Sequence, residues 1–286
     1  MTQYSDMLSL PPELIREIIE IVAYDAISQD LAWVATALVL VSRDIRAWVH
    51  PILYHTIHID MHNDEALLRL LDSKPLDFFA PTRHIILVDC FGRTITQRWL
   101  ANARLPHVET CTVDYGGFLA LQTQFIANIR PTRLILTFGA VPGLISARPF
   151  AAVTHLRLLL HMDVDWSSRF SKMPGLSHVV FDVVVMILSY AVSILEVNVR
   201  AALAVPTCQR VIVQIVDKNI NAKEEDADRR FDTVIRALRL FEDSRVYAAR
   251  VDDQHVWNRT FNGTARTCAR EARKDLDPWS IGDRVV

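Results

Sequence analysis

Short apolar segments recur along most of this 286-residue chain, and their spacing is the feature that most constrains the fold. Seven segments have the length and the β-branched composition of strands. Their first residues are separated by steps of 24, 25, 21, 23, 32 and 36 residues. The first four steps have the size of short structural repeats, each too small to bury its apolar face alone, and the last two are longer. The expected strands cover residues 84–88, 108–113, 133–138, 154–160, 177–184, 209–216 and 245–251.

Helices are expected between these strands, over residues 96–103, 117–129, 195–204 and 224–241. Several strands follow a similar phrase, in which a helix ends, a proline comes next and the strand begins. The phrase reads Leu105-Pro106-His107-Val108, Met173-Pro174-Gly175-Leu176 and Val205-Pro206-Thr207-Cys208. Alternating strands and helices predict an α/β fold with parallel strands and helical crossovers.

The fixed step favours stacking of the units into a solenoid. The pattern resembles a degenerate leucine-rich repeat, although the asparagine of a regular repeat of this family is missing. This resemblance implies a parallel β/α solenoid. A doubly wound α/β domain is the alternative arrangement of the same elements.

The N-terminal residues follow helical spacing instead. Pro11 and Pro12 suit the start of a helix, because a proline there loses no hydrogen bond. Ser42 can cap a later helix, and Pro51 is expected to end it. Three short helices cannot bury their apolar faces among themselves, so apolar surface is left for a partner. The apolar positions are Leu14, Ile15, Ile18, Ile19 and Val22 in the first helix, Leu31, Val34, Ala35 and Leu38 in a second that Asp30 can cap, and Ile45, Trp48 and Val49 in the third.

The opening of this region, Leu10-Pro11-Pro12-Glu13-Leu14-Ile15, and its close, from Val41 to Tyr54, resemble the F-box of the proteins that are numerous in fungi. The resemblance covers residues 10–59. It implies a helical module that binds a Skp-family adaptor of a cullin ubiquitin ligase, while the rest of the chain selects the target protein. The residues that it implies to face the adaptor are Leu10, Pro11, Leu14, Ile15, Ile18, Val41 and Trp48. An amphipathic helical cap on a larger domain is the alternative.

Composition argues against several other functions. The net charge is -2, so neither a nucleic acid nor a membrane is an expected partner. The longest apolar run, Val183 to Leu195, is too short to cross a bilayer. The four cysteines are far apart in sequence, which fits an intracellular protein, cytoplasmic or nuclear. Phosphate-binding and catalytic motifs are missing from the sequence, so we expect no enzyme activity, cofactor or metal site.

Aspartates occur at or just past the ends of several expected strands. In a parallel solenoid, equivalent positions stack into a row, which would form an acidic rim for a basic target. The alternative is that each aspartate caps the turn or helix after its strand. The aspartates of the possible rim are Asp89, Asp114, Asp163, Asp182 and Asp217.

These patterns divide the chain into an F-box-like module (1–60), a leucine-rich-repeat-like α/β domain (61–257) and a C-terminal cap or tail (258–286). The leading hypothesis is a non-catalytic, substrate-recognition subunit of a Skp-cullin-F-box ubiquitin ligase. It would bind the adaptor, and through it a cullin, with its first helices and a protein target with its repeats. The alternatives are a leucine-rich-repeat interaction scaffold with a helical cap and an α/β enzyme.

Overall fold

The computed structural model describes residues 10–29, 31–75, 77–89, 94–122, 129–137, 150–160, 166–184, 188–216, 224–251, 279 and 283–285. Its central element is a nine-stranded sheet, in which the strands follow one another in the order of the sequence. The first eight strands are parallel, and the last is antiparallel to its neighbour. The strands are β1 (Thr56–Ile59), β2 (His84–Leu87), β3 (Thr110–Val113), β4 (Arg133–Leu136), β5 (His155–Leu160), β6 (His178–Val184), β7 (Arg210–Val216), β8 (Val246–Val251) and β9 (Asp283–Arg284).

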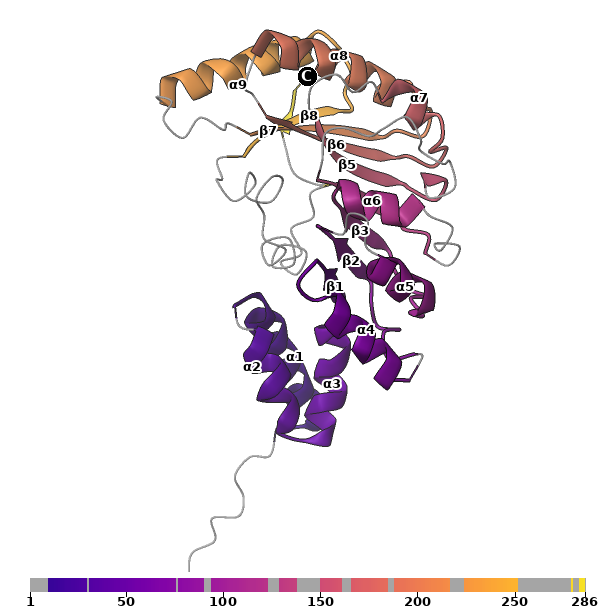
Figure 1. The fold of residues 1–286 in the computed structure, drawn as a ribbon. Helices are drawn as coiled ribbons and strands as arrows, with labels where there is room; N and C mark the ends of the chain where they lie inside the picture. Colours follow the sequence, from indigo (N-terminus) through magenta and orange to yellow (C-terminus); the bar gives the residue numbers. More distant parts are fainter. Residues whose placement is uncertain are drawn as a thin grey trace, which may run out of the picture.

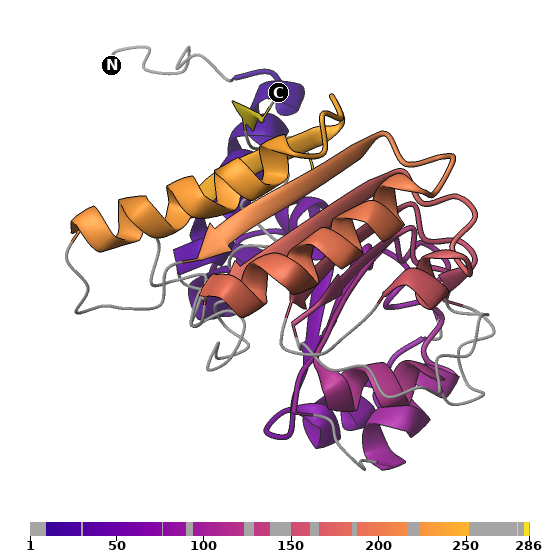
Figure 2. The same cartoon turned by 90° about the horizontal axis from the view of Figure 1, so that it is seen from above.

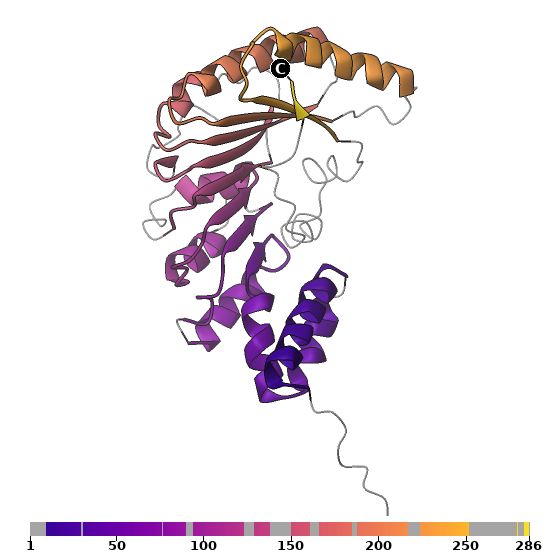
Figure 3. The same ribbon diagram turned by 180° about the vertical axis from the view of Figure 1, so that it is seen from behind.

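Two groups of helices accompany the sheet (Figure 1). The first group precedes it and consists of α1 (Pro12–Gln29), α2 (Leu31–Thr36), the 3-10 helix η1 (Leu38–Leu40) and α3 (Arg43–Leu53). The second group alternates with the strands: α4 (Asp64–Ser73), α5 (Thr94–Asn102), α6 (Tyr115–Gln122), α7 (Ser167–Phe170), α8 (Leu188–Leu203) and α9 (Glu224–Arg239). Figures 1 and 3 show the second group along one side of the sheet.

This arrangement confirms the α/β class and the parallel strands. Each of the seven expected strands is present, and the apolar run from Val183 to Leu195 contains the end of β6 and part of α8. In a doubly wound sheet the strand order reverses near the middle, whereas the described strands keep the order of the sequence. The sheet begins with β1, at Thr56, which lies inside the range 1–60 assigned to the helical module.

The core lies between the sheet and helices α4 to α9. Every second strand residue points into it, for example Leu158 of β5, Phe181 of β6 and Val213 of β7, all fully buried. The helices contribute large side chains such as Trp99 of α5 and Phe170 of α7. Seen from above in Figure 2, the two long helices α8 and α9 lie side by side over the long C-terminal strands.

Successive strands are joined by the same backbone hydrogen bonds. The carbonyl group just before one strand accepts two consecutive N–H groups at the start of the next. The Thr132 carbonyl accepts from Thr154 at 2.8 Å and His155 at 3.0 Å, and the Thr154 carbonyl accepts from Ser177 at 2.8 Å and His178 at 3.0 Å. Each repeat therefore positions the next through its backbone. The carbonyls of His55, Arg83, Glu109 and Ser177 make the same pair of bonds.

The recurring proline phrase forms the turn before a strand. The Leu176 N–H donates to the Met173 carbonyl at 3.0 Å, and the Cys208 N–H donates to the Val205 carbonyl at 3.0 Å. All four of these residues are buried. The proline is the second residue of the turn, where its fixed φ is favourable and its missing N–H is not needed.

Helix α6 approaches strand β2 closely at Gly117. A Cβ atom on Gly117 would lie 2.5 Å from the carbonyl oxygen of Leu87 and 2.6 Å from its Cβ atom. We expect Gly117→Ala to lower the free energy of unfolding by about 2 kcal/mol, because the sheet and the helix must separate to admit a methyl group. Urea denaturation of the purified protein measures this change.

Gly175→Ala is the matched control. A Cβ atom there would meet the Thr154 Cγ2 atom at 3.7 Å, an ordinary contact, so its effect should stay within about 0.5 kcal/mol. Equal effects of the two substitutions would contradict the close approach of α6 to β2.

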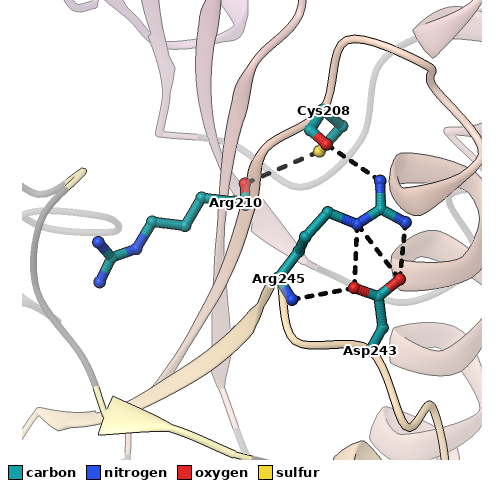
Figure 4. A network of polar contacts seen from close by, with 4 residues as sticks. All are labelled: Cys208, Arg210, Asp243 and Arg245. Carbon is teal, nitrogen blue, oxygen red and sulfur yellow. Dashed lines mark hydrogen bonds and ion pairs between the residues drawn. The ribbon is translucent and has the colours of Figure 1, made fainter.

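The side chain of Arg245 links the starts of the last two parallel strands, β7 and β8 (Figure 4). The Arg245 guanidinium donates to the Cys208 carbonyl at 3.0 Å and to the Asp243 carboxylate, with a shortest distance of 2.6 Å. The Arg245 N–H also donates to Asp243 Oδ1 at 2.9 Å. The hydrogen bonds from the Arg245 side chain are the main reason why the pKa of the Asp243 carboxyl is lowered.

The Asp243 carboxylate makes stability depend on pH. Its pKa in the folded protein is below that of an unfolded aspartate, about 3.9. Its contribution is therefore complete above about pH 4 and is lost as the pH falls through the folded pKa. We expect Asp243→Asn to lower the free energy of unfolding by about 1 kcal/mol at pH 7, because the ion pair is partly exposed.

Urea denaturation at pH 7 and at pH 3 tests this expectation. The difference between wild type and Asp243→Asn should shrink at the lower pH. Asp232→Asn, an exposed position of α9, makes the same charge change away from Arg245 and should show a smaller effect. A difference for Asp243→Asn that grows at low pH would contradict the direction of the pKa shift.

Candidate protein-binding surfaces

Helices α1 to α3 form a bundle with a core separate from that of the sheet. The bundle starts where the sequence predicts it, since the Pro11 carbonyl accepts the N–H groups of Leu14 at 3.0 Å and Ile15 at 3.1 Å. Ser42 caps α3 as expected, with its Oγ accepting from the Ile45 N–H at 3.1 Å. The predicted cap Asp30 lies outside the described residues. The buried core of the bundle consists of Ala23, Val34, Leu38, Val49 and Ile52.

The expectation that Pro51 ends the third helix is wrong, because α3 continues to Leu53. Proline removes its own N–H donor, but the N–H groups of the residues after it stay available. The helix continues past Pro51 because the Tyr54 N–H donates to the His50 carbonyl at 3.2 Å.

A stripe of large apolar side chains on α1 is exposed. Leu14, Ile18 and Val22 recur at every fourth position, which places them on one face of the helix. Leu14 is 45% exposed and Ile18 is 48% exposed, and Ile15 and Ile21 flank them. The neighbouring face, which contains Ala23, packs into the bundle core. The apolar arc of α1 is therefore wider than the surface that the bundle buries. We call Leu14, Ile15, Ile18, Ile21 and Val22 the α1 stripe.

The other residues expected to face an adaptor lie near the two ends of the bundle sequence. Leu10 and Pro11 are exposed just before α1, and Val41 is exposed in the turn before α3. Trp48, on α3, is half-buried. Sequence reasoning missed Ile21, Tyr24, Trp33 and Leu40, which are also large, apolar and exposed. Within the described part of the chain, ten of the thirteen exposed large apolar residues lie between Leu10 and Val41.

An aromatic cluster joins the bundle to the sheet. The Tyr54 ring, just after α3, has its centroid 4.7 Å from that of Phe78, and His50 lies 4.9 Å from the same ring. Phe78 contacts Phe79, which in turn contacts Trp99 in the sheet core. Burial is the main cause of the lowered pKa of His50, and it also raises the pKa of Tyr54. The bundle is therefore attached through α3, and this contact does not use the α1 stripe.

The three described aspartates of the possible acidic rim, Asp89, Asp114 and Asp182, do not lie in one row of the register. Asp114 accepts hydrogen bonds from the Gly117 N–H at 2.7 Å and the Asp89 N–H at 2.6 Å, so it caps the start of α6. Burial raises the pKa of the Asp114 carboxyl. Asp182 is not at a strand end but lies within β6, where it is buried. Asp163 and Asp217 lie outside the described residues. For Asp114, the structure matches the capping alternative.

The sheet face opposite helices α4 to α9, which we call the inner face, is the second candidate surface. The strand register aligns its side chains in rows. The first row is polar and contains Thr56, His84, Thr110, Arg133, His155, His178 and Arg210. The next row becomes apolar toward its end and contains His58, Ile86, Thr112, Ile135, Arg157, Val180, Ile212 and Tyr247.

A buried polar network crosses the inner face. The Arg157 guanidinium donates to both carboxylate oxygens of Asp182, at 2.7 and 3.1 Å, and to Gln214 Oε1 at 2.9 Å. The side chain of Asp182 is 4% exposed and that of Arg157 is 14% exposed. A planar guanidinium held at both oxygens fixes the three strands β5, β6 and β7 relative to one another.

This network makes a testable prediction about stability. Arg157→Met should lower the free energy of unfolding by about 3 kcal/mol or more, because it leaves the Asp182 carboxylate buried without its guanidinium. The double variant Arg157→Met, Asp182→Leu should recover most of this loss, because no charge is then left buried. Urea denaturation of the four proteins of this double-mutant cycle measures both effects. Additive effects of the two substitutions would contradict a coupled pair.

None of the described helices is long and apolar enough to cross a membrane. Comparison with protein-family models, with curated proteins and with solved structures finds no match for this chain.

Proposed function

We propose that this chain is the substrate-recognition subunit of a Skp-cullin-F-box ubiquitin ligase. The observation that carries the proposal is the exposed α1 stripe, together with the exposed Leu40 and Val41 before α3. These residues belong to the segment whose sequence resembles the F-box, and an apolar patch on a folded bundle is typical of a protein-binding surface. Its partner would be a Skp-family adaptor, and through it a cullin.

The position of the stripe favours an adaptor-binding module over a plain cap. A helical cap would turn its apolar face toward the sheet that it covers. Here the bundle contacts the sheet side through His50 and Tyr54 of the α3 end, whereas Leu14, Ile18 and Ile21 of α1 stay exposed. The side chains that a cap would bury are thus the ones available to a partner.

The sheet domain would hold the target protein. In this proposal it is a leucine-rich-repeat-like solenoid, supported by the sequential strand order and by the repeated hydrogen bonds at each strand start. The subunit would contribute to ubiquitination by proximity, since it brings the target close to the ubiquitin-charged enzyme. The packed aromatic cluster between bundle and sheet suits this role because it restricts their relative motion.

The alternative proposal is a leucine-rich-repeat interaction scaffold whose N-terminal helices only cap the first repeat. The packing of Tyr54 on Phe78, next to the β1 end of the sheet, favours this alternative. It expects no adaptor binding, so one experiment separates the two proposals.

The test is co-purification of the full chain with a Skp-family adaptor. We expect a one-to-one complex with the wild type, and at least about 100-fold weaker binding by Leu14→Asp, Ile18→Asp, because each substitution places a charge in an apolar interface. Val197→Asp, Leu240→Asp is the matched control. It adds the same charges at exposed apolar positions of α8 and just after α9, and it should bind normally.

Circular dichroism and thermal unfolding of all three proteins verify that the substitutions leave the fold intact. A folded wild type that does not bind the adaptor would favour the scaffold. Equal adaptor binding by the wild type and the Leu14→Asp, Ile18→Asp variant would remove the α1 stripe from the interface.

A further inference from the structure

A tryptophan from the C-terminal part of the chain is buried on the inner face. Trp279 is 5% exposed and clusters with Val180 and Ile212. The His155 ring meets its indole edge-on, with the ring centroids 5.0 Å apart and the planes at 73°. The sheet side chains of this cluster, together with His155 and the two residues packed against the cluster, come from five consecutive strands, β4 to β8. We call them the tryptophan socket: Ile135, His155, Val180, Ile212 and Tyr247.

Contacts within the sheet hold the walls of this socket. The His155 ring stacks on His178, with centroids 4.4 Å apart and planes at 5°, and its Nδ1 lies 2.8 Å from the Thr154 hydroxyl oxygen. The Arg210 guanidinium lies 3.9 Å from the centroid of the Tyr247 ring. Because residues of the sheet itself make these contacts, the socket is largely formed before an indole enters it.

The residues after Trp279 add a short strand to the sheet. In β9, Asp283 pairs with Ala248 of β8 and Arg284 pairs with Tyr247. The Val285 N–H donates to the Val246 carbonyl at 3.2 Å. Strand β8 has six residues, and β9 pairs with two of them. Backbone pairing at a sheet edge, combined with one side chain in a pocket, is a common way to bind an extended peptide.

We propose that the tryptophan socket and the adjoining edge of β8 bind a target polypeptide that carries a tryptophan followed, four residues later, by an extended segment. The chain's own Trp279 and β9 occupy this site until the target displaces them. The spacing of four residues is that between Trp279 and Asp283, the first residue of β9. The identification of this ligand as a target rests on the proposed function, whereas the site itself does not.

The energetics allow this exchange. One large buried side chain stabilises the docked tail, and only two residue pairs hold β9 on β8. A target with the same tryptophan can pair with more of the six residues of β8. The tethered tail competes for the site at an effective concentration of about 1 mM. A separate peptide therefore binds the wild type only if its concentration or its affinity is high enough to displace the tail.

The first experiment supplies the tail in trans. A fluorescein-labelled peptide with the sequence of residues 275–286 is titrated with the full chain carrying Trp279→Ala, and binding is followed by fluorescence polarisation. We expect this variant to bind the peptide about 10- to 100-fold more tightly than the wild type, whose own Trp279 competes. A peptide with alanine in place of its tryptophan should not bind.

Substitutions in the sheet localise the bound peptide. Adding Ile135→Gln to the Trp279→Ala chain should weaken peptide binding at least tenfold, because it places an amide in the socket. Arg133→Gln is the matched control on the same strand and the same face, outside the socket, and it should bind the peptide normally. Trp279→Leu, which keeps an apolar side chain in the socket, serves as a second competitor-weakened chain if Trp279→Ala unfolds.

Three outcomes would overturn the proposal: a folded Trp279→Ala chain that does not bind the peptide, equal binding by this chain and the wild type, or unfolding of both Trp279 variants. Lack of binding would mean that the socket does not bind a separate peptide, equal binding would mean that Trp279 does not compete for it, and unfolding of both variants would make Trp279 a permanent part of the fold. Adaptor binding by the Trp279→Ala chain is measured in parallel and should equal that of the wild type. The socket and the adaptor-binding proposal can therefore fail independently.

Discussion

Pairing of each strand with the next one in the sequence is the constraint on which the rest of this structure depends. Two parallel neighbours must be joined by a crossover connection. Among the described parallel strands, each crossover places the next strand directly beside the one before it. The carbonyl before each of the strands β1 to β6, such as that of Thr132, then accepts two N–H groups from the next repeat. Helices α4 to α9 pack on one face as a consequence, and the other face keeps ordered rows of side chains.

These rows give the inner face its two properties. The first is rigidity, since Arg157 links β5 to β6 and β7 through Asp182 and Gln214. The second is a change of polarity across the face. The row at the strand starts is polar, whereas the second row is apolar near Val180 and Ile212. Trp279 binds where the apolar part of one row meets His155 of the other. Trp279 thus belongs to a group of side chains from five strands, β4 to β8.

Most of the fold could be predicted from the sequence, because buried parallel strands are continuous apolar runs. The runs that became β5, β6 and β7 were recognised nearly to the residue. Strand β1 has four residues, in which Thr56 and His58 alternate with the apolar residues Ile57 and Ile59, so it is not a continuous apolar run. Strand β9 has only two residues, Asp283 and Arg284, and no pattern of its own. Such an element is recognised by its pairing with the edge of β8, which depends on the folded structure.

The sites were less predictable than the fold. Apolar spacing on α1 identified Leu14, Ile15 and Ile18 as one face, but it could not tell which part of the apolar arc the bundle would bury. That choice depends on the packing of α1 against α3. Asp182 was expected near a strand end, yet in the register it lies beside Leu159, two residues beyond Arg157. Ion pairs across strands depend on register, which a single sequence does not reveal.

The sequential strand order also makes the two ends of the sheet unequal. Stability in such a structure is a sum over neighbouring units, so unfolding can begin at an end and progress inward. At the β1 end, the chain continues into the helical bundle, and Tyr54, Phe78 and Phe79 pack together at the junction. At the other end, β8 is covered only by β9, a strand of two residues, within the described part of the chain. Amide hydrogens should therefore exchange first from β8 and last from the middle strands, which gives the protein one firm end and one that opens readily.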